Sequence, residues 1–472
     1  MNACPHASSA DVDSAVRPAT PEERSRLLLP PGPKGRFGNL LPWLFSHPQF
    51  ADRLQRRYGD IVRFRLPWKD CCMVCDPVLA AGVLAKEGEL FSQGMASVKM
   101  PRMPNHFLQQ LHGEEHRWRW EILRPVFTED GLNEYEDIIV ERVLAMQERW
   151  RPGDEFDVVQ EMLRLMSAIS GLMFFGRDMD APPEIGFDAR RSLKWDLLFN
   201  YQPLPPALLR RLLPMRSLRV ADSVLAKFDD LIRRAIERSR EPSFEGRDLI
   251  TRMVRGRAGN GARRRFTDGE IHDDVYAIVA GALGPTSNTV SWCLQYLAEN
   301  PAARERLERE VDEVLDGKPI AAFDEKRLPY AHAVLKEGLR FAPPAYFTDK
   351  FAMKDCVVGD YLVPKDTWVW PVPGIIHRRA DHFEKPLEFR PERWLDGRES
   401  ELPPHAYFPY GYGYRTCLGD QYGKRVAVYC LASFAQRWRL DPASLKPARP
   451  TFYLSGPYKK TGGWRMRLSR RP

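Results

Sequence analysis

The sequence has no apolar run long enough to cross a membrane. A spanning helix needs about 18 to 20 consecutive apolar residues, and no stretch of this 472-residue chain reaches that length. Residues 1–26 are polar and charged, without the apolar segment of a secretory signal peptide. The eight cysteines are scattered along the chain, a pattern typical of a reducing compartment. We therefore expect a cytoplasmic protein with no membrane anchor.

The chain also lacks any block of five or six like charges. Its net charge is +8, but this charge is spread over the whole sequence rather than gathered in a basic arm. We therefore expect no nucleic-acid partner. The Cys72-x-x-Cys75 pair has no second pair of metal ligands close behind it, so it does not predict a zinc site.

What the chain does have is a distinctive stretch around Cys417, FPYGYGYRTCLGDQYG at 408–423. Glycines on both sides of the cysteine permit tight backbone turns that other residues resist. Apolar residues after it recur at helical spacing, which predicts a helix that begins just beyond Cys417. A helix N-terminus and the nearby Arg415 both favour an anion, so the thiolate form is stabilised. The pattern indicates a thiolate that serves as an axial ligand to iron.

This stretch resembles the haem-binding loop of the cytochromes P450, Phe-x-x-Gly-x-Arg-x-Cys-x-Gly. Gly413, Arg415, Cys417 and Gly419 match, Tyr410 replaces the phenylalanine, and Gly411 adds a further glycine. The resemblance implies haem b, iron protoporphyrin IX, with Cys417 as metal ligand and Arg415 beside a propionate. A hydroxyl at Tyr410 would lie near the sulfur, where it can tune the redox potential.

The resemblance covers roughly residues 29–470 and sets the expected architecture. It implies a mostly α fold with a smaller β-rich lobe, the P450 fold, in a single catalytic domain of residues 29–472. Residues 1–28 are predicted to form a flexible tail. The resemblance further implies a monomeric monooxygenase that oxidises a small, largely apolar organic substrate in specialised metabolism, with ferredoxin or a similar protein as electron donor.

A long central helix is predicted to begin at a capping box formed by Thr267 and Glu270. It resembles the P450 helix that crosses the distal haem face and carries Ala-Gly-x-x-Asp/Glu-Thr. Ala280 and Gly281 match, but Gly284 replaces the acid and Pro285 the threonine. These two groups normally organise water and deliver protons.

The missing acid and threonine leave two readings open. In one, the enzyme uses dioxygen with protons relayed by water, by the substrate or by Thr286, one position further along. In the other, it is a P450-like isomerase, dehydratase, peroxygenase or enzyme of nitrogen oxides that needs no such delivery. A non-catalytic haem sensor is a third, remote alternative.

Three further groups on the chain are predicted to hold the haem propionates. His116 and Trp120 occupy the places of the family's Trp-x-x-x-Arg pair, and both can donate hydrogen bonds. Lys350 replaces an arginine seven residues after Pro343, as a point charge without the guanidinium fork. The nearby arginines 117, 119 and 124 are expected to face solvent, where they contribute to a docking face for the redox partner.

The proximal scaffold carries Glu337-x-x-Arg340 and a PERW segment with Arg393. These resemble the family's structural Glu-Arg-Arg triad, which locks the scaffold under the haem loop. His377 is interpreted as a structural hydrogen-bonding residue. The residues predicted to line the substrate pocket are Met95, Val98, Met100, Met103, Phe107, Ala282, Tyr346, Phe347 and Leu454.

Overall fold

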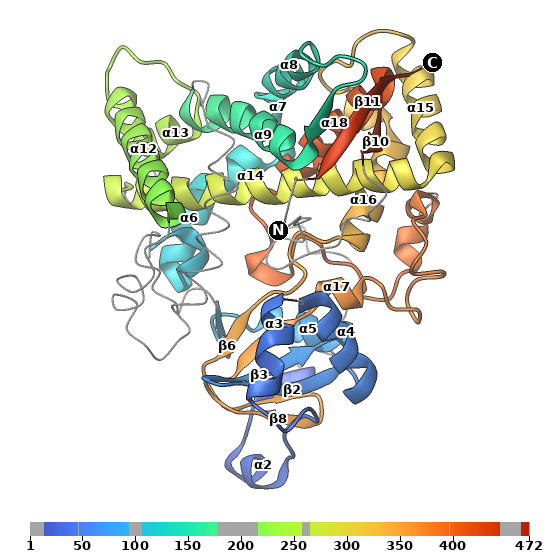
Figure 1. Ribbon diagram of the computed structural model, residues 1–472. Coiled ribbons are helices and arrows are strands. Elements are labelled where there is room, and N and C mark those ends of the chain that lie inside the picture. Colours follow the sequence, from blue (N-terminus) through green and yellow to red (C-terminus); the bar gives the residue numbers. More distant parts are fainter. Residues whose placement is uncertain are drawn as a thin grey trace. The chain divides into compact units, whose positions relative to one another are not determined.

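The structure is a computed structural model that describes residues 14–45, 47–93, 106–176, 216–256, 265–395, 397–443 and 464–471. The chain divides into two compact units (Figure 1). We call one the β-rich unit; it comprises residues 1–98, 336–417 and 448–458. The other, the helix-rich unit, comprises residues 99–335, 418–447 and 459–472. The chain passes from the first unit to the second directly after Cys417.

The β-rich unit contains a five-stranded sheet in the order β2-β3-β9-β6-β4 and a three-stranded sheet in the order β1-β7-β8. Its strands are β1 (Val16–Pro18), β2 (Ile61–Leu66), β3 (Lys69–Val74), β4 (Phe91–Gln93), β6 (Lys350–Ala352), β7 (Cys356–Val358), β8 (Tyr361–Val363) and β9 (Trp368–Pro371). Its helices are α2 (Pro21–Arg26), α3 (Leu40–Phe45), α4 (His47–Tyr58), α5 (Pro77–Ala85) and α17 (Pro373–Ile376). Short 3₁₀ helices are η1 (Phe37–Asn39), η6 (Pro391–Trp394), η7 (Arg398–Glu401) and η8 (Gly413–Arg415).

The hairpin of β2 and β3 follows from side-chain alternation. Val62, Phe64 and Leu66 are buried, whereas Arg63 and Arg65 between them are half-buried. Because successive side chains of a strand point to opposite faces, this order gives one fully buried face. The two strands pair antiparallel, which confirms the predicted hairpin.

The N-terminal boundary lies earlier in the chain than the sequence predicted. Val16 is fully buried and pairs with Val358 of β7. Thr20 caps α2 in a capping box with Glu23, whose side chain also binds Arg17. The described part of the predicted tail of residues 1–28 is therefore part of the fold, because its backbone and a core side chain are paired with the sheet.

The helix-rich unit is built around one long helix. The α-helices of this unit are α6 (Gly113–Leu123), α7 (Glu129–Asn133), α8 (Glu136–Gln147), α9 (Val158–Phe175), α12 (Arg216–Ser239), α13 (Leu249–Arg255), α14 (Asp268–Glu299), α15 (Pro301–Leu315) and α18 (Asp420–Arg437). Helix α16 (Pro329–Phe341) continues from this unit into the β-rich unit. A sheet in the order β10-β11-β5 is formed by β5 (Glu155–Asp157), β10 (Trp438–Pro442) and β11 (Arg465–Arg470). The 3₁₀ helices are η3 (Leu108–Gln110), η4 (Arg124–Phe127) and η5 (Asp324–Arg327).

Helix α14 crosses the whole helix-rich unit (Figure 1). Its N-terminus is closed by the predicted capping box, in which the Thr267 hydroxyl accepts from the Glu270 N–H and the Glu270 carboxylate accepts from the Thr267 N–H. Pro285 lies inside the helix, which continues through it. Because proline has no N–H, one helical hydrogen bond is missing at this turn. The 32-residue helix still persists because most of its length is buried.

Helix α9 is the one helix in the described part of the chain that is long and apolar enough to cross a membrane. In the structure, 78% of its 18 residues are buried against the rest of the chain. It starts at the N-cap Asp157 and ends at Gly176, whose φ of 62° closes the helix. The helix is placed as a core helix of its unit, packed beside α8 and α14.

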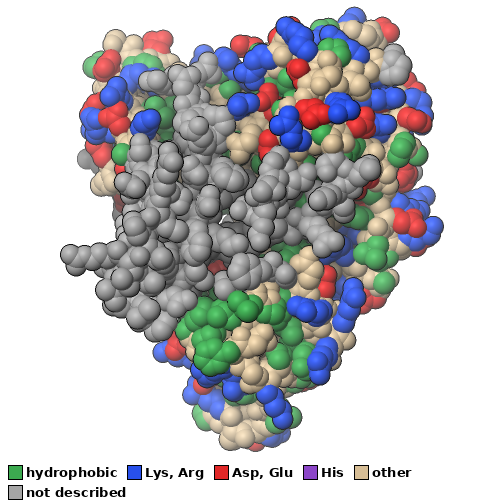
Figure 2. Space-filling model, viewed as in Figure 1, with side chains coloured by type: hydrophobic (Ala, Val, Ile, Leu, Met, Phe, Trp, Pro, Cys, Tyr) green, Lys and Arg blue, Asp and Glu red, His purple; other side chains and the backbone are tan. Residues whose placement is uncertain are grey.

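The described chain confirms the predicted fold class, a mostly α protein with a smaller β-rich part. On the face shown in Figure 2, Lys and Arg side chains lie among Asp and Glu side chains over the described surface. This distribution agrees with the diffuse net charge of +8.

Candidate functional site

The loop around Cys417 is held by its own backbone. The Cys417 N–H donates to the carbonyl of Tyr410 over 2.8 Å, and the Gly411 N–H donates to the carbonyl of Phe408 over 3.1 Å. Gly411 and Gly413 have φ of 81° and 76°, a region that only glycine adopts readily. A Cβ on Gly413 would make only an ordinary contact, 3.4 Å from the Cα of Ala85 in α5, so the backbone conformation and not the space is what favours glycine. The loop therefore needs glycine at both positions.

Cys417 differs from the other described cysteines by its exposure. Its side chain is exposed, whereas the other six described cysteines are buried. Burial raises the pKa of Cys72 and of Cys293 to about 12, so both stay protonated thiols. Burial likewise raises the pKa of the Cys75 thiol. Within the described residues, Cys417 is the one cysteine presented for ligation.

The residues that directly follow Cys417 belong to the helix-rich unit and are held there by contacts of their own. Gly419 is the N-cap of α18, three residues before Tyr422. Arg124 donates to the carbonyl of Leu418 over 2.9 Å and pairs with Asp420 at 3.0 Å. Arg124 was predicted to face solvent; instead it is half-buried and fixes the residue that directly follows Cys417.

Lys350 and Arg415, two of the predicted propionate partners, both form ion pairs with Glu87. This buried acid was not among the residues predicted from the sequence. The Glu87 carboxylate is fully buried, 2.7 Å from the Lys350 Nζ and 3.3 Å from the Arg415 Nε. Lys350 also donates to the Gln93 side chain over 3.1 Å. The structure thus brings both cations to one carboxylate within the unit that carries Cys417. No sequence signal marks Glu87, which follows α5 in an ordinary charged turn.

These residues fit a haem. An exposed thiol in a glycine-rich loop supplies a soft ligand for iron, and two nearby cations suit carboxylates. His116 and Trp120, the other predicted propionate partners, lie one turn apart on α6 with their rings stacked at 5.7 Å. His116 is buried and Trp120 half-buried.

The prediction that Arg119 faces solvent is also wrong. Its side chain is fully buried and pairs with Asp274 at 3.1 Å and Glu270 at 3.0 Å, both on α14. Asp274 also accepts from the Leu108 N–H over 2.5 Å. Burial raises the pKa of Asp274 to about 6, although Arg119 opposes the shift. A sequence signal was present, because Asp274 is a charged residue within the apolar stripe of a helix and therefore needs a buried partner.

Ala280 and Gly281 form an exposed patch on a helix that is otherwise largely buried. Ala282, predicted to line the pocket, is buried, and so is Gly284. Exposure of two small residues leaves room beside this turn of α14 for a flat group or a substrate.

Thr286 differs from its neighbours on α14 in its hydrogen bonding. The hydroxyls of Ser287, Thr289 and Ser291 each donate to the carbonyl four residues before them. Thr286 is 7% exposed, and its side-chain hydroxyl makes no hydrogen bond among the described residues. Its Oγ1 lies 3.8 Å from where a Cβ on Gly423 of α18 would stand. Its hydroxyl is thus the one at this turn that is not committed to the helix backbone.

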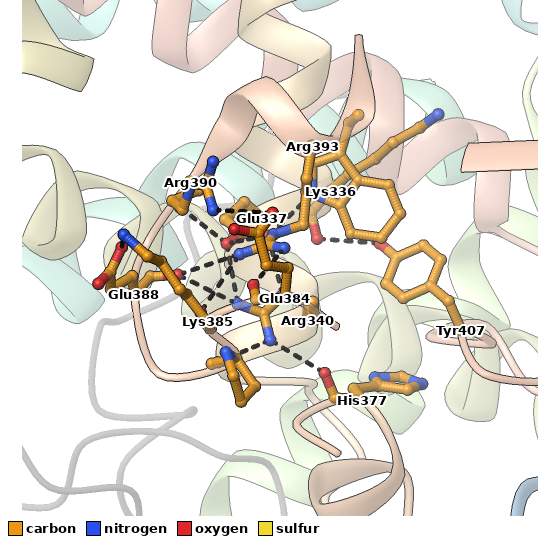
Figure 3. Close-up of polar contacts among 12 residues, drawn as sticks. Lys336, Glu337, Arg340, His377, Glu384, Lys385, Glu388, Arg390, Arg393 and Tyr407 are labelled. Carbon is orange, nitrogen blue, oxygen red and sulfur yellow. Dashed lines mark hydrogen bonds and ion pairs between the residues drawn. The ribbon is translucent and has the colours of Figure 1, made fainter. Parts of the chain in front are cut away.

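The three triad residues are brought together in the β-rich unit (Figure 3). The Arg340 guanidinium donates two hydrogen bonds of 2.9 Å to the Glu337 carboxylate, and both side chains are fully buried. Arg393 and the Trp394 indole also donate to Glu337, over 3.1 and 2.8 Å. A buried charge with this many partners is stable only as a complete network.

His377 lies between this network and the Cys417 loop. Its carbonyl accepts from Arg340 over 3.0 Å, and its Nε2 accepts from the Phe408 N–H over 3.1 Å. Burial and the cations Arg340 and Arg378 lower the pKa of His377 to about 3. The ring is therefore neutral, with a structural hydrogen bond as the sequence indicated.

The predicted pocket residues have mixed placements. Met95, Val98, Met100, Met103 and Leu454 lie outside the described residues. Phe107 is half-buried before η3. Tyr346 is buried, with its hydroxyl bonded to Asp52 over 3.2 Å and to Arg378 over 2.8 Å. Phe347 packs on Tyr346 and on Trp370. The Tyr346 hydroxyl is thus occupied by structural contacts.

Comparison with known proteins gives a consistent picture. The family model described as Cytochrome P450 matches residues 29–460. Cyclooctatin synthase of Streptomyces melanosporofaciens is 28% identical, over 94% of this chain and 95% of its own. Cyclooctat-9-en-7-ol 5-monooxygenase of the same organism is 26% identical, over 82% of this chain and 83% of its own. Pentalenene oxygenase of Streptomyces avermitilis is 25% identical, over 83% of this chain and 87% of its own.

Proposed function

The chain belongs to the cytochrome P450 family, and we propose that its substrate is a cyclic terpenoid. It is a haem b monooxygenase that oxidises an apolar molecule in specialised metabolism. The names of three relatives support this substrate class, since they denote a cyclooctatin synthase, an oxygenase of pentalenene and a monooxygenase of cyclooctat-9-en-7-ol. A largely hydrocarbon substrate offers few polar groups, so its recognition depends mainly on burial of apolar surface.

The single observation that carries the site assignment is the exposed Cys417 in a backbone-locked glycine loop. Its exposure contrasts with the buried, protonated thiols of the other described cysteines. We assign Cys417 as the residue whose thiolate would hold the haem iron, with Arg415 and Lys350 of the same unit as the partners of the propionates. His116 and Trp120 stay predictions from the sequence, as do Tyr410, Gly411 and Gly419 in the ligand loop.

When bound, the haem would supply the chemistry of dioxygen activation and oxygen insertion, for which a thiolate ligand is suited. The residues of this chain supply ligation, orientation and protons. Arg124 and His377 hold the two ends of the ligand loop. Ala280 and Gly281 leave open space along α14, because neither carries a side chain larger than a methyl group.

We assign proton delivery to the Thr286 hydroxyl together with water. The usual acid and threonine are replaced by Gly284 and Pro285, so neither position can donate a proton through its side chain. Thr286 is adjacent and buried, and its hydroxyl makes no hydrogen bond to the helix backbone among the described residues. A hydroxyl that is not committed to a backbone carbonyl can relay a proton within hydrogen-bond reach.

The partners and the location follow from the same assignment. We propose a ferredoxin or a similar small protein as electron donor, a monomeric enzyme and a cytoplasmic location. The diffuse positive surface supports an acidic electron donor, because complementary charge speeds encounter. The bacterial origin of the terpenoid-oxidising relatives supports the cytoplasm.

Turnover under labelled dioxygen tests the proposal. Purified holoenzyme is supplied with a ferredoxin, its reductase and NADPH, and with pentalenene and cyclooctat-9-en-7-ol as separate probes. Oxidised product that carries one labelled oxygen atom supports a terpenoid monooxygenase. Product formed from hydrogen peroxide alone, and absent with NADPH and dioxygen, supports the alternative without proton delivery. A substrate-type spectral change and turnover with fatty acids but not with either terpenoid would overturn the substrate class.

A further inference from the structure

Glu87 is a buried acid whose position has no role in the family resemblance. It follows α5, two residues beyond Ala85, and its side chain has 0% exposure. Both carboxylate oxygens contact cations, one at 2.7 Å from the Lys350 Nζ and the other at 3.3 Å from the Arg415 Nε. Lys350 and Arg415 are themselves nearly buried, with side chains 6% and 9% exposed. Glu87 therefore joins two cations that are 65 positions apart in the chain.

Two elements of the β-rich unit, β6 and η8, bring a cation to this carboxylate, and a third, β4, holds one of the two cations. Lys350 begins β6, which pairs antiparallel with β4, and Gln93 of β4 accepts from the same Nζ. Arg415 ends η8, which packs on the C-terminal end of α5. Glu87 stands between them in the turn from α5 to β4. Its charge thus fixes the direction of both cations relative to the loop that carries Cys417.

The same two cations are the groups that we assign to the haem propionates. A propionate is a carboxylate, so it has the charge and the geometry of the Glu87 side chain. The attraction of a buried cation acts on every carboxylate around it, and because the surroundings are of low dielectric, each negative charge changes the energy of the others. Glu87 and the propionates therefore draw on one shared pair of cations.

We propose that Glu87 is a positioning residue for the haem, which orients Arg415 and Lys350 and reduces the positive charge that they present to the propionates. This inference rests on the proposed function, because it takes the propionates to lie at these two cations. Removal of the Glu87 charge is therefore expected to strengthen the attraction of Arg415 and Lys350 for the propionates. It also makes reduction of the iron easier, since a more positive surrounding favours the ferrous state.

Glu87→Gln tests this inference because it removes the charge and keeps the shape. Glu308→Gln is the matched control: Glu308 is a buried acid between Arg439 at 2.7 Å and Arg471 at 3.6 Å, in the helix-rich unit. Haem loss from each holoenzyme to apomyoglobin is measured, together with the Fe(III)/Fe(II) midpoint potential. The same proteins are also reconstituted with haem dimethyl ester, which carries no propionate charge.

We expect an effect on haem, which carries charged propionates, and none on haem dimethyl ester, which does not. Glu87→Gln slows haem loss roughly tenfold, the effect of about one charge-assisted contact, and shifts the midpoint potential in the positive direction. It leaves loss of the dimethyl ester unchanged. Glu308→Gln changes neither the haem-loss rate nor the potential. Lys350→Gln is expected to have the opposite effects, faster haem loss and a more negative midpoint potential. It tests the inference independently if Glu87→Gln does not fold.

Two results would overturn the inference. One is equally faster loss of haem and of its dimethyl ester from Glu87→Gln, which would make Glu87 a purely structural residue. The other is an unchanged midpoint potential in both Glu87→Gln and Lys350→Gln. The red-shifted Soret band of the ferrous carbonyl complex is recorded for every variant. Its presence in the wild type keeps the proposed function separate from these outcomes, since it reports the Cys417 ligand and not the propionates.

Discussion

The Nε2 of His377 accepts a hydrogen bond from the backbone N–H of Phe408 over 3.1 Å. Phe408 is the residue at which the Cys417 loop begins, and the carbonyl of the same histidine accepts from Arg340 over 3.0 Å. One buried residue thus connects the ligand loop with the Glu337 network, through its neutral ring on one side and its backbone carbonyl on the other. The geometry of the loop is therefore set by the scaffold as well as by its own glycines.

His377 makes the fold sensitive to acid. Its pKa is lowered to about 3 by burial and two arginines, against an ordinary value near 6.5. A group with a lowered folded-state pKa contributes stability above about pH 6.5, and this contribution is lost as the pH falls toward 3. We expect His377→Asn to be less stable at pH 7 by about 1–3 kcal/mol but to lose less stability between pH 7 and pH 4. Urea unfolding at a series of pH values measures both, and parallel losses in the two proteins would contradict the assignment.

Glu337 is expected to be the most sensitive acid in the β-rich unit. Glu337→Gln leaves Arg340 buried without its anion, and removal of one partner of a buried ion pair costs about 3–5 kcal/mol. Glu384→Gln is the control, because the Glu384 side chain is 77% exposed and pairs with Arg390 at 3.5 Å. That surface pair contributes less than about 1 kcal/mol.

Chemical unfolding and the haem content of purified protein measure the two changes. We expect Glu337→Gln to lose stability and to be recovered largely without haem, since the loop under the haem loses its support. Equal stability and haem content for the two variants would show that the network does not hold the loop.

The contribution of Asp274 to folding stability is expected to depend on pH with the sign opposite to that of His377. Burial raises its pKa to about 6, from about 3.9 in an unfolded chain. Its contribution to stability is thus fully present below about pH 3.9 and is lost as the pH rises through 6. The difference in stability between wild type and Asp274→Asn is expected to shift by on the order of 1–3 kcal/mol between pH 4.5 and 7.5, in favour of the variant at high pH. A pH-independent difference would show that Arg119 keeps Asp274 ionised throughout this range.

Thr286 is expected to control coupling rather than substrate binding. Thr286→Ala removes the one hydroxyl at this turn that is not bonded to the helix backbone, so more reductant is consumed per product and more peroxide is released. Thr289→Ala is the matched control, because its hydroxyl already donates to the Pro285 carbonyl over 3.0 Å. Coupling is measured as product formed per NADPH consumed. A loss of coupling in Thr289→Ala equal to that in Thr286→Ala would contradict the assignment.

Local patterns in the sequence predicted much of the architecture. The capping box of Thr267 and Glu270, the hairpin of β2 and β3, and the spacing of Glu337 and Arg340 are short-range features. Each depends on residues a few positions apart, whose relation is fixed by the geometry of a helix or strand. Such features can be recognised without knowledge of the tertiary fold.

The placement of charged side chains could not be predicted in this way. Arg119 and Arg124 share a short, strongly basic segment that looks solvated, yet one is fully buried against Asp274 and the other holds Leu418. Their partners lie 155 and 294 positions further along the chain. Glu87 is a similar case, because nothing near it in the sequence indicates Lys350 or Arg415. For such residues, contacts with partners far away in the sequence decide whether the side chain is buried. Local periodicity in the sequence does not reveal these contacts.

The thiolate ligand is the central claim, and the ferrous carbonyl spectrum tests it most directly. The wild-type holoenzyme is reduced and exposed to carbon monoxide, beside Cys417→Ser and the buried-cysteine controls Cys430→Ser and Cys293→Ser. We predict the red-shifted Soret band of a haem-thiolate in the wild type and in both controls, and its absence in Cys417→Ser. A red-shifted band that persists in Cys417→Ser would show that another residue holds the iron.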